Sequence, residues 1–455
     1  MNLESSISAL IAKYDTPTPR YTSYPTVPYW DKTSINEALW KENCISALKE
    51  NDGKISLYIH LPFCETLCTY CGCNKRITKN HAVEMPYLEA VLKEWEMYKS
   101  IFNQKPIIQA IHLGGGTPTF FSAENLEFLL SSILNDVEVA ENKEFSIEVH
   151  PSFTNVDQLQ ALSKLGFERI SLGVQDFSEE VQFIINRPQT VAQTNFIVQE
   201  ARKFGFKGVN VDLVYGLPKQ TLQSIEYTIN EVIKMQPERI AFYSYAHVPW
   251  KSAGQRRYKD EDVPAGAEKR ALYELGRKLL LAFGYQEIGM DHFALPGDEL
   301  LIADENGTLH RNFMGYTTTQ RKGFLLGLGV SSISDSWSAF MQNVKEVESY
   351  QEKLQNNELP LLKGHLLSEK DKFWREKILN LMCQHEVKLS EIQPDELEAL
   401  LIQLAPIADD QLISLEKETI KVNETGKMFI RNIAQCFDER HHSSINKVSA
   451  FSKSV

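Results

Sequence analysis

YIHLPFCETLCTYCGCNK, at residues 58–75, is the stretch that decides the fold. It begins in an apolar run, 55–61, that is rich in the β-branched and aromatic residues of a buried strand. Cys64, Cys68 and Cys71 follow with the spacing C-x3-C-x2-C. Thiolates are soft ligands that suit iron–sulfur clusters and zinc. Three of them on one loop can hold three irons of a 4Fe–4S cube and leave the fourth iron open to another ligand.

A structural zinc site is the alternative for this loop. Such a site usually takes four ligands from two knuckles. The sequence has only one knuckle, because Cys383 and Cys436 are distant and no His-x3–5-His pair accompanies it. Cys73 could supply a fourth ligand, but a fourth thiolate would close the open position. We therefore predict that Cys73 lies beside a cluster without ligating it.

Alternating strand-like and helix-like segments extend from this loop towards the C-terminus. Five further apolar runs predict strands, at 107–113, 145–149, 170–175, 209–214 and 240–246. The segments between and after them have helical spacing, at 84–100, 122–135, 155–165, 178–186, 190–204 and 221–235. Parallel neighbours need long crossovers, so six such units predict an α/β protein with a parallel sheet. Six units are too few for a full barrel, which favours an incomplete barrel or an open sheet; one more strand is expected at 285–290, after a long helix.

The two ends of the chain do not show this alternation of strand-like and helix-like segments. Residues 1–50 carry four prolines with aromatic residues between them, which predicts an extended N-terminal arm or cap. Residues 51–360 contain the strand–helix series and its extension. From 361 to 455 the pattern changes to helices with charged faces, and we expect a small, mostly helical C-terminal domain there.

Composition limits the partners. The 455 residues carry 60 acidic and 48 basic side chains, a formal net charge of −12, which disfavours nucleic acid as a partner. No run of 18 apolar residues is present, so no membrane span is expected. The N-terminus lacks the pattern of a secretory signal, and seven cysteines do not form a disulfide framework, which together favour the cytoplasm.

Glycine and polar residues gather where the predicted strands end. In α/β sheets and barrels, chemistry occurs at the C-terminal ends of strands. The residues concerned are Gly115, Gly116 and Thr117 after the second run, Glu148 and Gln175 at the ends of the third and fourth, and Asp212 in the fifth. The alternatives are a simple turn for the glycines and a hydrogen-bonded core position for the others.

Eight stretches, together with the cysteine spacing, resemble one protein family. They are PRYTSYPT (19–26), YIHLPFC (58–64), CGCNK (71–75), HLGGGTPT (112–119), SLGVQDF (171–177), DLVYGLPKQT (212–221), GMDHFALP (289–296) and LHRNFMGYTT (309–318). The sequence is similar to the oxygen-independent coproporphyrinogen III oxidases, or dehydrogenases, of the radical S-adenosylmethionine (SAM) superfamily. The resemblance implies an incomplete (βα)6 barrel with an N-terminal arm and a C-terminal helical domain.

The resemblance also implies a reaction and its cofactors. Two propionates of coproporphyrinogen III are oxidatively decarboxylated to vinyl groups, which gives protoporphyrinogen IX in anaerobic haem biosynthesis. The enzyme would use a 4Fe–4S cluster, two SAM molecules per substrate and an electron donor of the flavodoxin or ferredoxin type that the sequence does not identify. A cytoplasmic monomer is expected.

Site residues follow from the same resemblance, position by position. The cluster ligands would be Cys64, Cys68 and Cys71. Contacts to the cluster-bound SAM would come from Tyr58, Gly115, Glu148 and Ile333. Contacts to the second SAM would come from Tyr70, Gly116, Thr117, Gln175, Arg187, Asp212 and Ala246. For Arg187, a cap on a helix C-terminus is the alternative. We further expect the substrate propionates to meet Arg20, Arg256, Arg257 or Arg311, because the guanidinium fork suits carboxylates.

Two departures from the family pattern stand out. His150 replaces the acidic residue that usually follows Glu148-Val149, and residues 320–324 replace a short stretch with glycine and aspartate. They leave open a paralogue that acts as a haem chaperone or a haem-modifying enzyme. Cys73 and the HRNFMGYTT stretch argue against that alternative.

Overall fold

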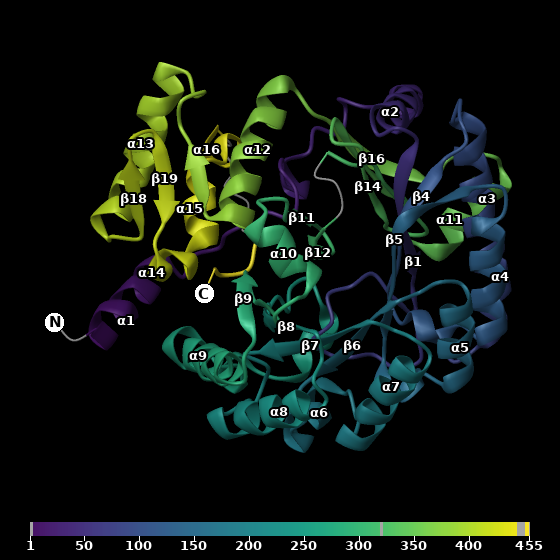
Figure 1. Ribbon diagram of the computed structural model, residues 1–455, viewed down its shortest axis with the longest axis horizontal. Helices are drawn as coiled ribbons and strands as arrows, with labels where there is room; N and C mark the ends of the chain where they lie inside the picture. The colour runs from purple at the N-terminus through teal and green to yellow at the C-terminus, as the bar shows by residue number, and fades with distance from the viewer. Residues whose placement is uncertain (1–2, 319–321, 444–450, 455) are drawn as a thin grey trace.

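Six parallel strands form the centre of the molecule, as the sequence predicts. The computed structural model describes residues 3–318, 322–443 and 451–454 (Figure 1). The strands are adjacent in chain order: β1 (Lys54–Leu61), β4 (Ile107–Gly115), β5 (Glu138–Val149), β6 (Arg169–Gln175), β7 (Gly208–Tyr215) and β8 (Arg239–Ser244). The sheet curves without closing, so the architecture is the expected incomplete barrel.

Helices cover the outer face of this sheet (Figure 1). They are α3 (Glu84–Ile101), α4 (Ala123–Leu134), α5 (Val156–Lys164), α6 (Glu179–Ile185), α7 (Val191–Lys203), α8 (Leu222–Lys234) and α9 (Gly266–Ala282). Side-chain caps start several of them: Ser122 accepts from the N–H of Asn125, and Thr190 and Thr221 form capping boxes.

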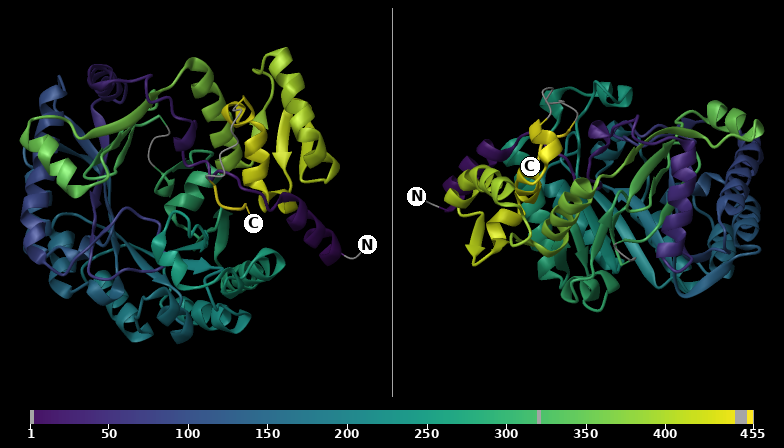
Figure 2. Two further views of the ribbon diagram at one scale, coloured as in Figure 1. Left: turned by 180° about the vertical axis from the view of Figure 1, so that it is seen from behind. Right: turned by 90° about the horizontal axis from the view of Figure 1, so that it is seen from above.

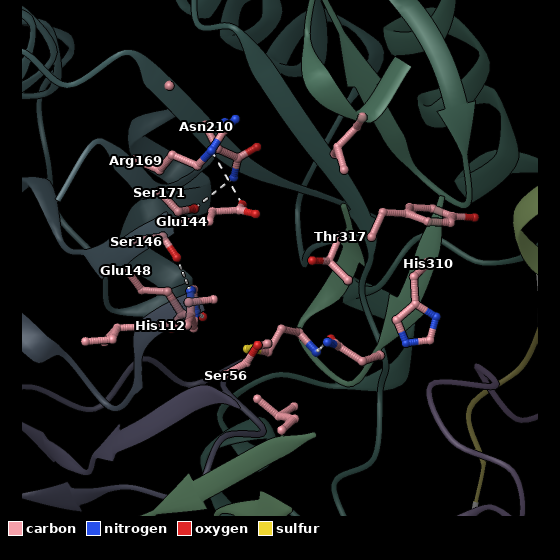
Figure 3. Close-up of a pocket in the computed structure, with 18 of the residues that line it drawn as sticks. Ser56, His112, Glu144, Ser146, Glu148, Arg169, Ser171, Asn210, His310 and Thr317 are labelled. Carbon is pink, nitrogen blue, oxygen red and sulfur yellow. Dashed lines mark hydrogen bonds and ion pairs between the residues drawn. The ribbon is translucent and has the colours of Figure 1, made fainter. Parts of the chain in front are cut away.

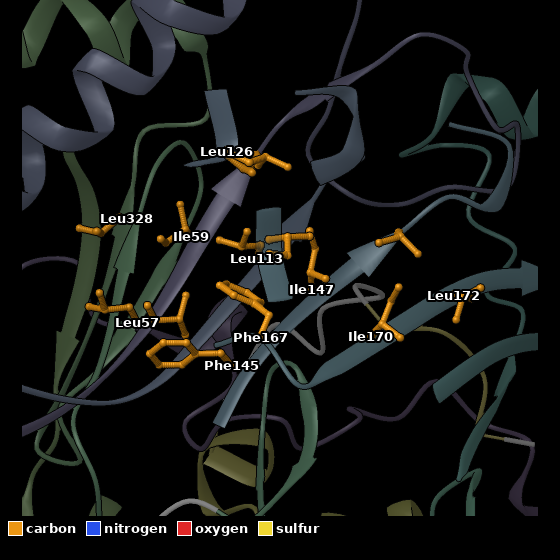
Figure 4. Packing of buried hydrophobic residues seen from close by; sticks show 14 of the residues in the cluster. Leu57, Ile59, Leu113, Leu126, Phe145, Ile147, Phe167, Ile170, Leu172 and Leu328 are labelled. Carbon is orange, nitrogen blue, oxygen red and sulfur yellow. The ribbon is translucent and has the colours of Figure 1, made fainter. Parts of the chain in front are cut away.

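The main core lies between sheet and helices (Figure 4). Alternate residues of each strand, such as Leu57 and Ile59, Phe145 and Ile147, point outwards and are almost fully buried there. Because side chains alternate along a strand, the residues between them face the barrel interior. The period of two therefore separates core positions from candidate site positions.

The sheet continues past the barrel on both sides. Beyond β8 lie β10 (His292–Ala294) and β9 (Gln286–Gly289), both antiparallel, so the strand expected at 285–290 is present. Beyond β1 lie β13 (Leu325–Leu328), β14 (Ile333–Asp335), β15 (Ala339–Asn343) and β16 (Leu361–Leu366). Shorter elements complete this part: β2 (Phe63–Cys64) with β3 (Arg76–Ile77), β11 (His310–Asn312) with β12 (Gly315–Thr317), α10 (Glu299–Glu305) and α11 (Val347–Gln355).

Residues 1–50 are not a single extended arm, which corrects the prediction. α2 (Glu37–Glu50) buries Trp40, Cys44 and Leu48 in the main core. Their spacing of four residues is a helical signal that the prolines before it obscured. By contrast, α1 (Leu3–Tyr14) packs on the C-terminal region, as do the tyrosines of the segment that follows.

The C-terminal region, at the opposite end from α3 and α4, has its own core (Figure 2). Its helices are α12 (Glu369–Gln384), α13 (Pro394–Asp409), α14 (Glu424–Lys427), α15 (Ile430–Cys436) and α16 (Glu439–Ser443). It also holds an antiparallel sheet of β17 (Glu386–Lys388), β19 (Thr419–Val422) and β18 (Ile413–Glu416), which the helical prediction omitted. Since β16 belongs to the main sheet, the region begins after it, later than the predicted residue 361. No helix in the described ranges is long and apolar enough to cross a bilayer.

A buried carboxylate fixes the loop between β13 and β14. Glu94 on α3 is fully buried and accepts hydrogen bonds from the N–H of Gly329 at 2.8 Å, Asn343 Nδ2 at 2.7 Å and Tyr350 Oη at 2.5 Å. Burial raises the pKa of Glu94 to about 7, although these hydrogen bonds act to lower it. The charged form is therefore disfavoured in the folded protein.

This shift predicts a pH dependence of stability. A carboxyl whose pKa is raised on folding stabilises the protein below its unfolded pKa, and that contribution disappears as the pH rises through the folded value. We expect Glu94 to remove about 3 kcal/mol of stability between about pH 4.5 and 7. Between about pH 5 and 8, the melting temperature of Glu94→Gln should therefore rise relative to wild type. Glu89→Gln, an exposed position on the same helix, is the control; a constant difference between Glu94→Gln and wild type would contradict the prediction.

Candidate active site

The cysteine loop is closed at its base by one hydrogen bond and fastened to the barrel rim on two sides. The N–H of Arg76 donates to the carbonyl of Pro62 at 2.8 Å, and the N–H of Thr117 donates to that of Phe63 at 2.9 Å. From the other side, Asn186 Nδ2 donates to the carbonyl of Leu67 at 2.8 Å. The loop is therefore held between the glycine turn after β4 and the end of α6.

Two donors point at the sulfur atoms. Thr117 Oγ1 donates to Cys64 Sγ at 3.3 Å, and Arg187 Nη1 donates to Cys68 Sγ at 3.4 Å. Donors of this kind stabilise thiolate ligands and tune iron–sulfur clusters. Cys64, Cys68 and Cys71 form no disulfide in the described structure, so their thiols are available as ligands. This donor set fits a cluster held by Cys64, Cys68 and Cys71.

The arrangement of possible metal ligands also tests the alternative of a structural zinc site. Within the described residues, no three His, Cys, Asp or Glu side chains are grouped so as to hold a single metal ion. A four-iron cluster takes one thiolate per iron, so its ligands need not converge on one point.

Cys73 is exposed at the end of the loop, where Lys75 Nζ donates to its carbonyl at 3.3 Å and to that of Cys71 at 3.1 Å.

The glycines after β4 are required for close packing against the first strand and its loop. A Cβ on Gly115, whose φ is +121°, would lie 2.8 Å from the His60 ring. A Cβ on Gly116 would lie 2.5 Å from the carbonyl oxygen of Pro62. The sequence interpretation gave ligand approach or a simple turn as the role of these glycines, and the structure adds this steric reason.

Gly116→Ala is therefore expected to push the glycine turn away from the cysteine loop. A backbone carbonyl cannot yield as a flexible side chain can, so overpacking should cost about 1–3 kcal/mol. We expect a lower melting temperature and about tenfold weaker SAM binding, measured anaerobically on reconstituted protein. Wild-type SAM affinity in this variant would show that the turn does not take part in binding.

Glu148 ends a polar chain on the interior face of the barrel. His112 Nε2 lies 3.3 Å from Glu148 Oε1, and His112 Nδ1 lies 2.7 Å from Ser146 Oγ. The N–H of Gly115 also donates to Glu148 Oε2 at 3.4 Å. Burial acts to raise the pKa of Glu148, but the His112 and Gly115 hydrogen bonds outweigh it and hold that pKa below its usual value. An ionised Glu148 suits an ammonium partner.

Asp212 lies on the same interior face, two strands further on. Its carboxylate accepts hydrogen bonds from Ser171 Oγ and Asn210 Nδ2, both at 2.8 Å. Burial raises the pKa of Asp212 to about 6. Figure 3 shows Ser171 and Asn210 on the wall that also carries Glu148, facing a cavity of about 270 Å³.

Arg187 joins the cysteine loop to the fourth strand. Its side chain is buried, and Nε and Nη2 both donate to the carbonyl of Gly173 on β6. Gln175 closes β6 in the left-handed region, with φ +69°, which directs the chain out of the strand. The helix-cap alternative for Arg187 does not agree with these partners, which are a strand carbonyl and a thiol.

Gln255 links two predicted SAM positions, and the sequence interpretation missed it. Its Nε2 donates to the carbonyl of Tyr70 at 3.1 Å and to that of Ala246 at 3.2 Å. His112 and Asn210 are further polar groups at the site that the sequence interpretation did not select. For those two, the inward position of alternate strand residues was the available signal. Gln255 lies in the short 3-10 helix Ala253–Arg257 and had no such signal.

Ile333 lies on the side of β1 away from β4, two strands along the sheet. It begins β14, and its carbonyl lies against Gly327, the residue of β13 that pairs with Tyr58. The structure therefore places Tyr58 and Ile333 on either side of Gly327. Separately, Gln255 joins Tyr70 to Ala246, and Arg187 reaches Cys68.

The two departures have local explanations. His150 is buried and accepts from the N–H of Ser152 at 3.2 Å, which caps the short turn that follows β5. Burial and the nearby Arg187 lower its pKa to about 2, so it is neutral. Within 320–324, positions 320 and 321 lie outside the described residues; Phe324 is buried against Trp40.

Comparison with known proteins identifies this arrangement. The radical SAM superfamily model matches residues 58–232. The oxygen-independent coproporphyrinogen III oxidase of Pseudomonas aeruginosa is 38% identical over 450 residues, which cover 96% of each chain. That of Synechocystis is 36% identical and covers 98% of this chain and 97% of its own. The solved structure of the Escherichia coli coproporphyrinogen III oxidase, described as a radical SAM enzyme, superposes with a TM-score of 0.87 at 36% identity, covering 95% of this chain and 98% of that one.

Fold and cysteine loop together therefore define a radical SAM enzyme. Family membership brings with it a 4Fe–4S cluster and SAM, which the donor set of the loop fits. Within that class, the chain belongs to the oxygen-independent coproporphyrinogen III oxidases.

Proposed function

We propose that this chain oxidatively decarboxylates two propionates of coproporphyrinogen III to vinyl groups and so forms protoporphyrinogen IX for haem biosynthesis. The observation that carries the proposal is the position of the cysteine loop. Its thiols accept hydrogen bonds from Thr117, in the turn whose Gly115 N–H donates to Glu148, and from Arg187. The relatives' names support the substrate. They lend no support to a haem chaperone or a haem-modifying enzyme.

The chemistry explains why these cofactors are needed. No side-chain base can deprotonate the unactivated β-carbon of a propionate. When bound, the cluster and SAM supply one-electron chemistry that removes a hydrogen atom from such a carbon, and the protein positions the reactants and excludes water.

The residues divide into two sets around the loop. We assign Tyr58, Gly115, Glu148 and Ile333 to the SAM on the cluster. Gly115 presents an N–H beside the Glu148 carboxylate, a donor–acceptor pair that suits the carboxylate and ammonium of an amino acid. We assign Tyr70, Gly116, Thr117, Gln175, Arg187, Asp212 and Ala246 to a second SAM. The Asp212 carboxylate, held by Ser171 and Asn210, suits ribose hydroxyls or an ammonium group.

The direct test is an anaerobic assay. Reconstituted enzyme is incubated with coproporphyrinogen III, SAM and a one-electron reductant, and protoporphyrinogen is measured together with 5′-deoxyadenosine. We expect two molecules of 5′-deoxyadenosine per protoporphyrinogen, because each propionate loses one hydrogen atom. Failure to form protoporphyrinogen with an intact cluster would contradict the function.

Asp212→Asn tests the second SAM position. Replacing the carboxylate by an amide removes the charge and one acceptor while keeping the shape, so hydrogen bonds to SAM should weaken. We expect the second decarboxylation, or all turnover, to be lost while the cluster spectrum is retained. Unchanged activity and an unchanged number of bound SAM molecules would make Asp212 a core residue only, with two SAM molecules acting in turn at one site.

Three further properties belong to the proposal. We expect a one-electron donor of flavodoxin or ferredoxin type, since the cleavage of each SAM consumes one electron; the substrate radical passes one electron to an acceptor when it loses CO2. We also expect a cytoplasmic enzyme and a monomer in solution. Pull-down from anaerobic lysate, fractionation and light scattering test these in turn.

A further inference from the structure

A second cavity, of about 400 Å³, lies beside the barrel rim. Its lining comes from α9, the tip of the β9–β10 hairpin, the N-terminal segment and the C-terminal region. Four arginines and one aspartate line it: Arg20, Arg270, Arg277, Arg431 and Asp291. Arg270 pairs with Glu274, and Arg277 pairs with Glu287 and Glu424, which line the cavity as well. None of these residues belongs to the cluster or SAM sets described above.

Asp291 occupies the tip of the hairpin. Met290 and Asp291 both have left-handed backbone angles, with φ of +32° and +71°. Such a two-residue turn ordinarily takes Asn-Gly, so these residues carry backbone strain. The N–H of Phe242 on β8 donates to the Asp291 carbonyl at 2.7 Å, which fixes the tip to the rim. Among the described residues, the Asp291 carboxylate has neither a hydrogen bond nor an ion pair within 4.0 Å.

Guanidinium groups surround that carboxylate without touching it. Burial raises the pKa of Asp291, and four guanidinium charges oppose the rise, those of Arg20, Arg311, Arg431 and Arg270.

Several of these arginines retain unused donors. Arg311 is 5% exposed, packs over the Tyr316 ring, and its Nε and Nη1 have no acceptor among the described residues. Arg270 Nε is also buried without an acceptor. In the described part of the chain Arg20 makes one hydrogen bond, from Nη2 to the carbonyl of Ser244 at 2.8 Å. Buried donors of this kind cost free energy unless a ligand satisfies them.

Arg431 has a different task. Its guanidinium donates to backbone carbonyls of the N-terminal segment and of the segment near the C-terminus, including Pro19 and Lys453. These bonds hold Arg20 against the rim. Arg311 does not line this cavity, but its charge acts on Asp291. Arg256 and Arg257, which the sequence analysis also nominated, are exposed after β8, do not line the cavity and are not among the charges that act on Asp291.

Tyr243 connects this cluster with the SAM site. Its hydroxyl lies 3.2 Å from His292 Nε2, next to Asp291 in the chain. Burial raises the pKa of Tyr243, and the charges that act on it include those of Asp212, Arg311, Glu148 and Asp291. The arginine cluster and the second SAM set therefore face the same tyrosine.

We propose that Asp291 and the arginines around it bind the tetrapyrrole itself: Asp291 accepts hydrogen bonds from the pyrrole N–H groups, and Arg20, Arg270 and Arg311 bind propionates. A porphyrinogen carries four N–H donors at its centre and carboxylates at its edge. A carboxylate within a ring of guanidinium groups is the complement of that pattern. This inference rests on the proposed function and names the residues that position its substrate.

Equilibrium dialysis under anaerobic conditions tests it without turnover. Reconstituted enzyme with SAM but no reductant is dialysed against coproporphyrinogen III, which is quantified after oxidation to the fluorescent porphyrin. We expect about 10- to 100-fold weaker binding for Arg311→Gln and about tenfold for Asp291→Asn. Arg257→Gln, an exposed arginine stacked on Phe183, should bind as wild type does.

The Asp291→Asn variant is decisive, because the two explanations of Asp291 predict opposite changes in the affinity for the substrate. If Asp291 only balances the arginines, removing its charge should tighten binding of a polyanion, and that result overturns the proposal. Equal affinity in Arg20→Gln, Arg311→Gln and Asp291→Asn also overturns it. Cluster absorbance, melting temperature and SAM binding establish that each variant is folded. Wild-type enzyme that fails to bind coproporphyrinogen III would instead contradict the proposed function.

Discussion

Cys71→Ser is expected to abolish both the cluster and turnover. A serine hydroxyl is not ionised near neutral pH and is a poor ligand for iron, so one of three protein ligands is lost. After anaerobic reconstitution we expect the bound iron and the brown cluster absorbance to fall to background, with no 5′-deoxyadenosine formed. Cys64→Ser and Cys68→Ser should behave in the same way.

Cys73→Ser is the matched control for that experiment. Cys73 is exposed at the end of the loop, and we expect its serine variant to keep the cluster and the SAM-binding position. If Cys73→Ser loses iron as completely as Cys71→Ser, the assignment of three ligands is wrong, and the loop has a fourth.

Arg187→Met has the second largest expected effect. The side chain is buried and connects Cys68 Sγ with the carbonyl of Gly173, so one substitution removes a donor to the sulfur and a cation beside the loop. Partners of metal ligands typically contribute about 10- to 100-fold to metal affinity or activity, and we expect a loss of that size in turnover. The reduction potential of the cluster should also fall, because a positive charge and a hydrogen bond that favour the reduced form are gone.

Arg187→Lys separates the effect of the positive charge from that of the hydrogen bonds. Lysine keeps the charge but lacks the planar fork that reaches two acceptors, so its turnover should lie between those of Met and wild type. Potentiometry followed by spectroscopy measures the potential, and Arg257→Met controls for loss of a nearby arginine. An unchanged potential together with unchanged turnover in Arg187→Met would show that Arg187 only supports packing of the loop.

Much of the site could be read from local sequence. C-x3-C-x2-C after the first strand, Gly115-Gly116-Thr117 after the second and Glu148 at the end of the third lie next to strong strand signals. Parallel strands bring their C-terminal ends to one rim, so order along the chain translates directly into proximity. For this reason the cysteine loop, the glycine turn and Glu148 lie together as predicted.

Position in the chain did not predict which elements pack together where the contacts join segments distant in sequence. Helix 37–50 enters the main core, and β16 joins the main sheet, because both bury apolar surface against strands far away in sequence. Gln255 reaches Tyr70 across 185 residues. Such pairings depend on how loops fold back, which local periodicity does not encode.

By itself, the sequence determined the chemistry and the strand order, because cysteine spacing and alternating strand and helix patterns are properties of short segments. Only the tertiary structure decided which charges meet. It placed Arg20, from the N-terminal segment, and Arg311, from the stretch before β13, around Asp291 on a hairpin between them in the chain, and it set Arg256 and Arg257 apart. The physical reason is that electrostatic and hydrogen-bonding partners are chosen by distance in space, which packing of the whole core fixes.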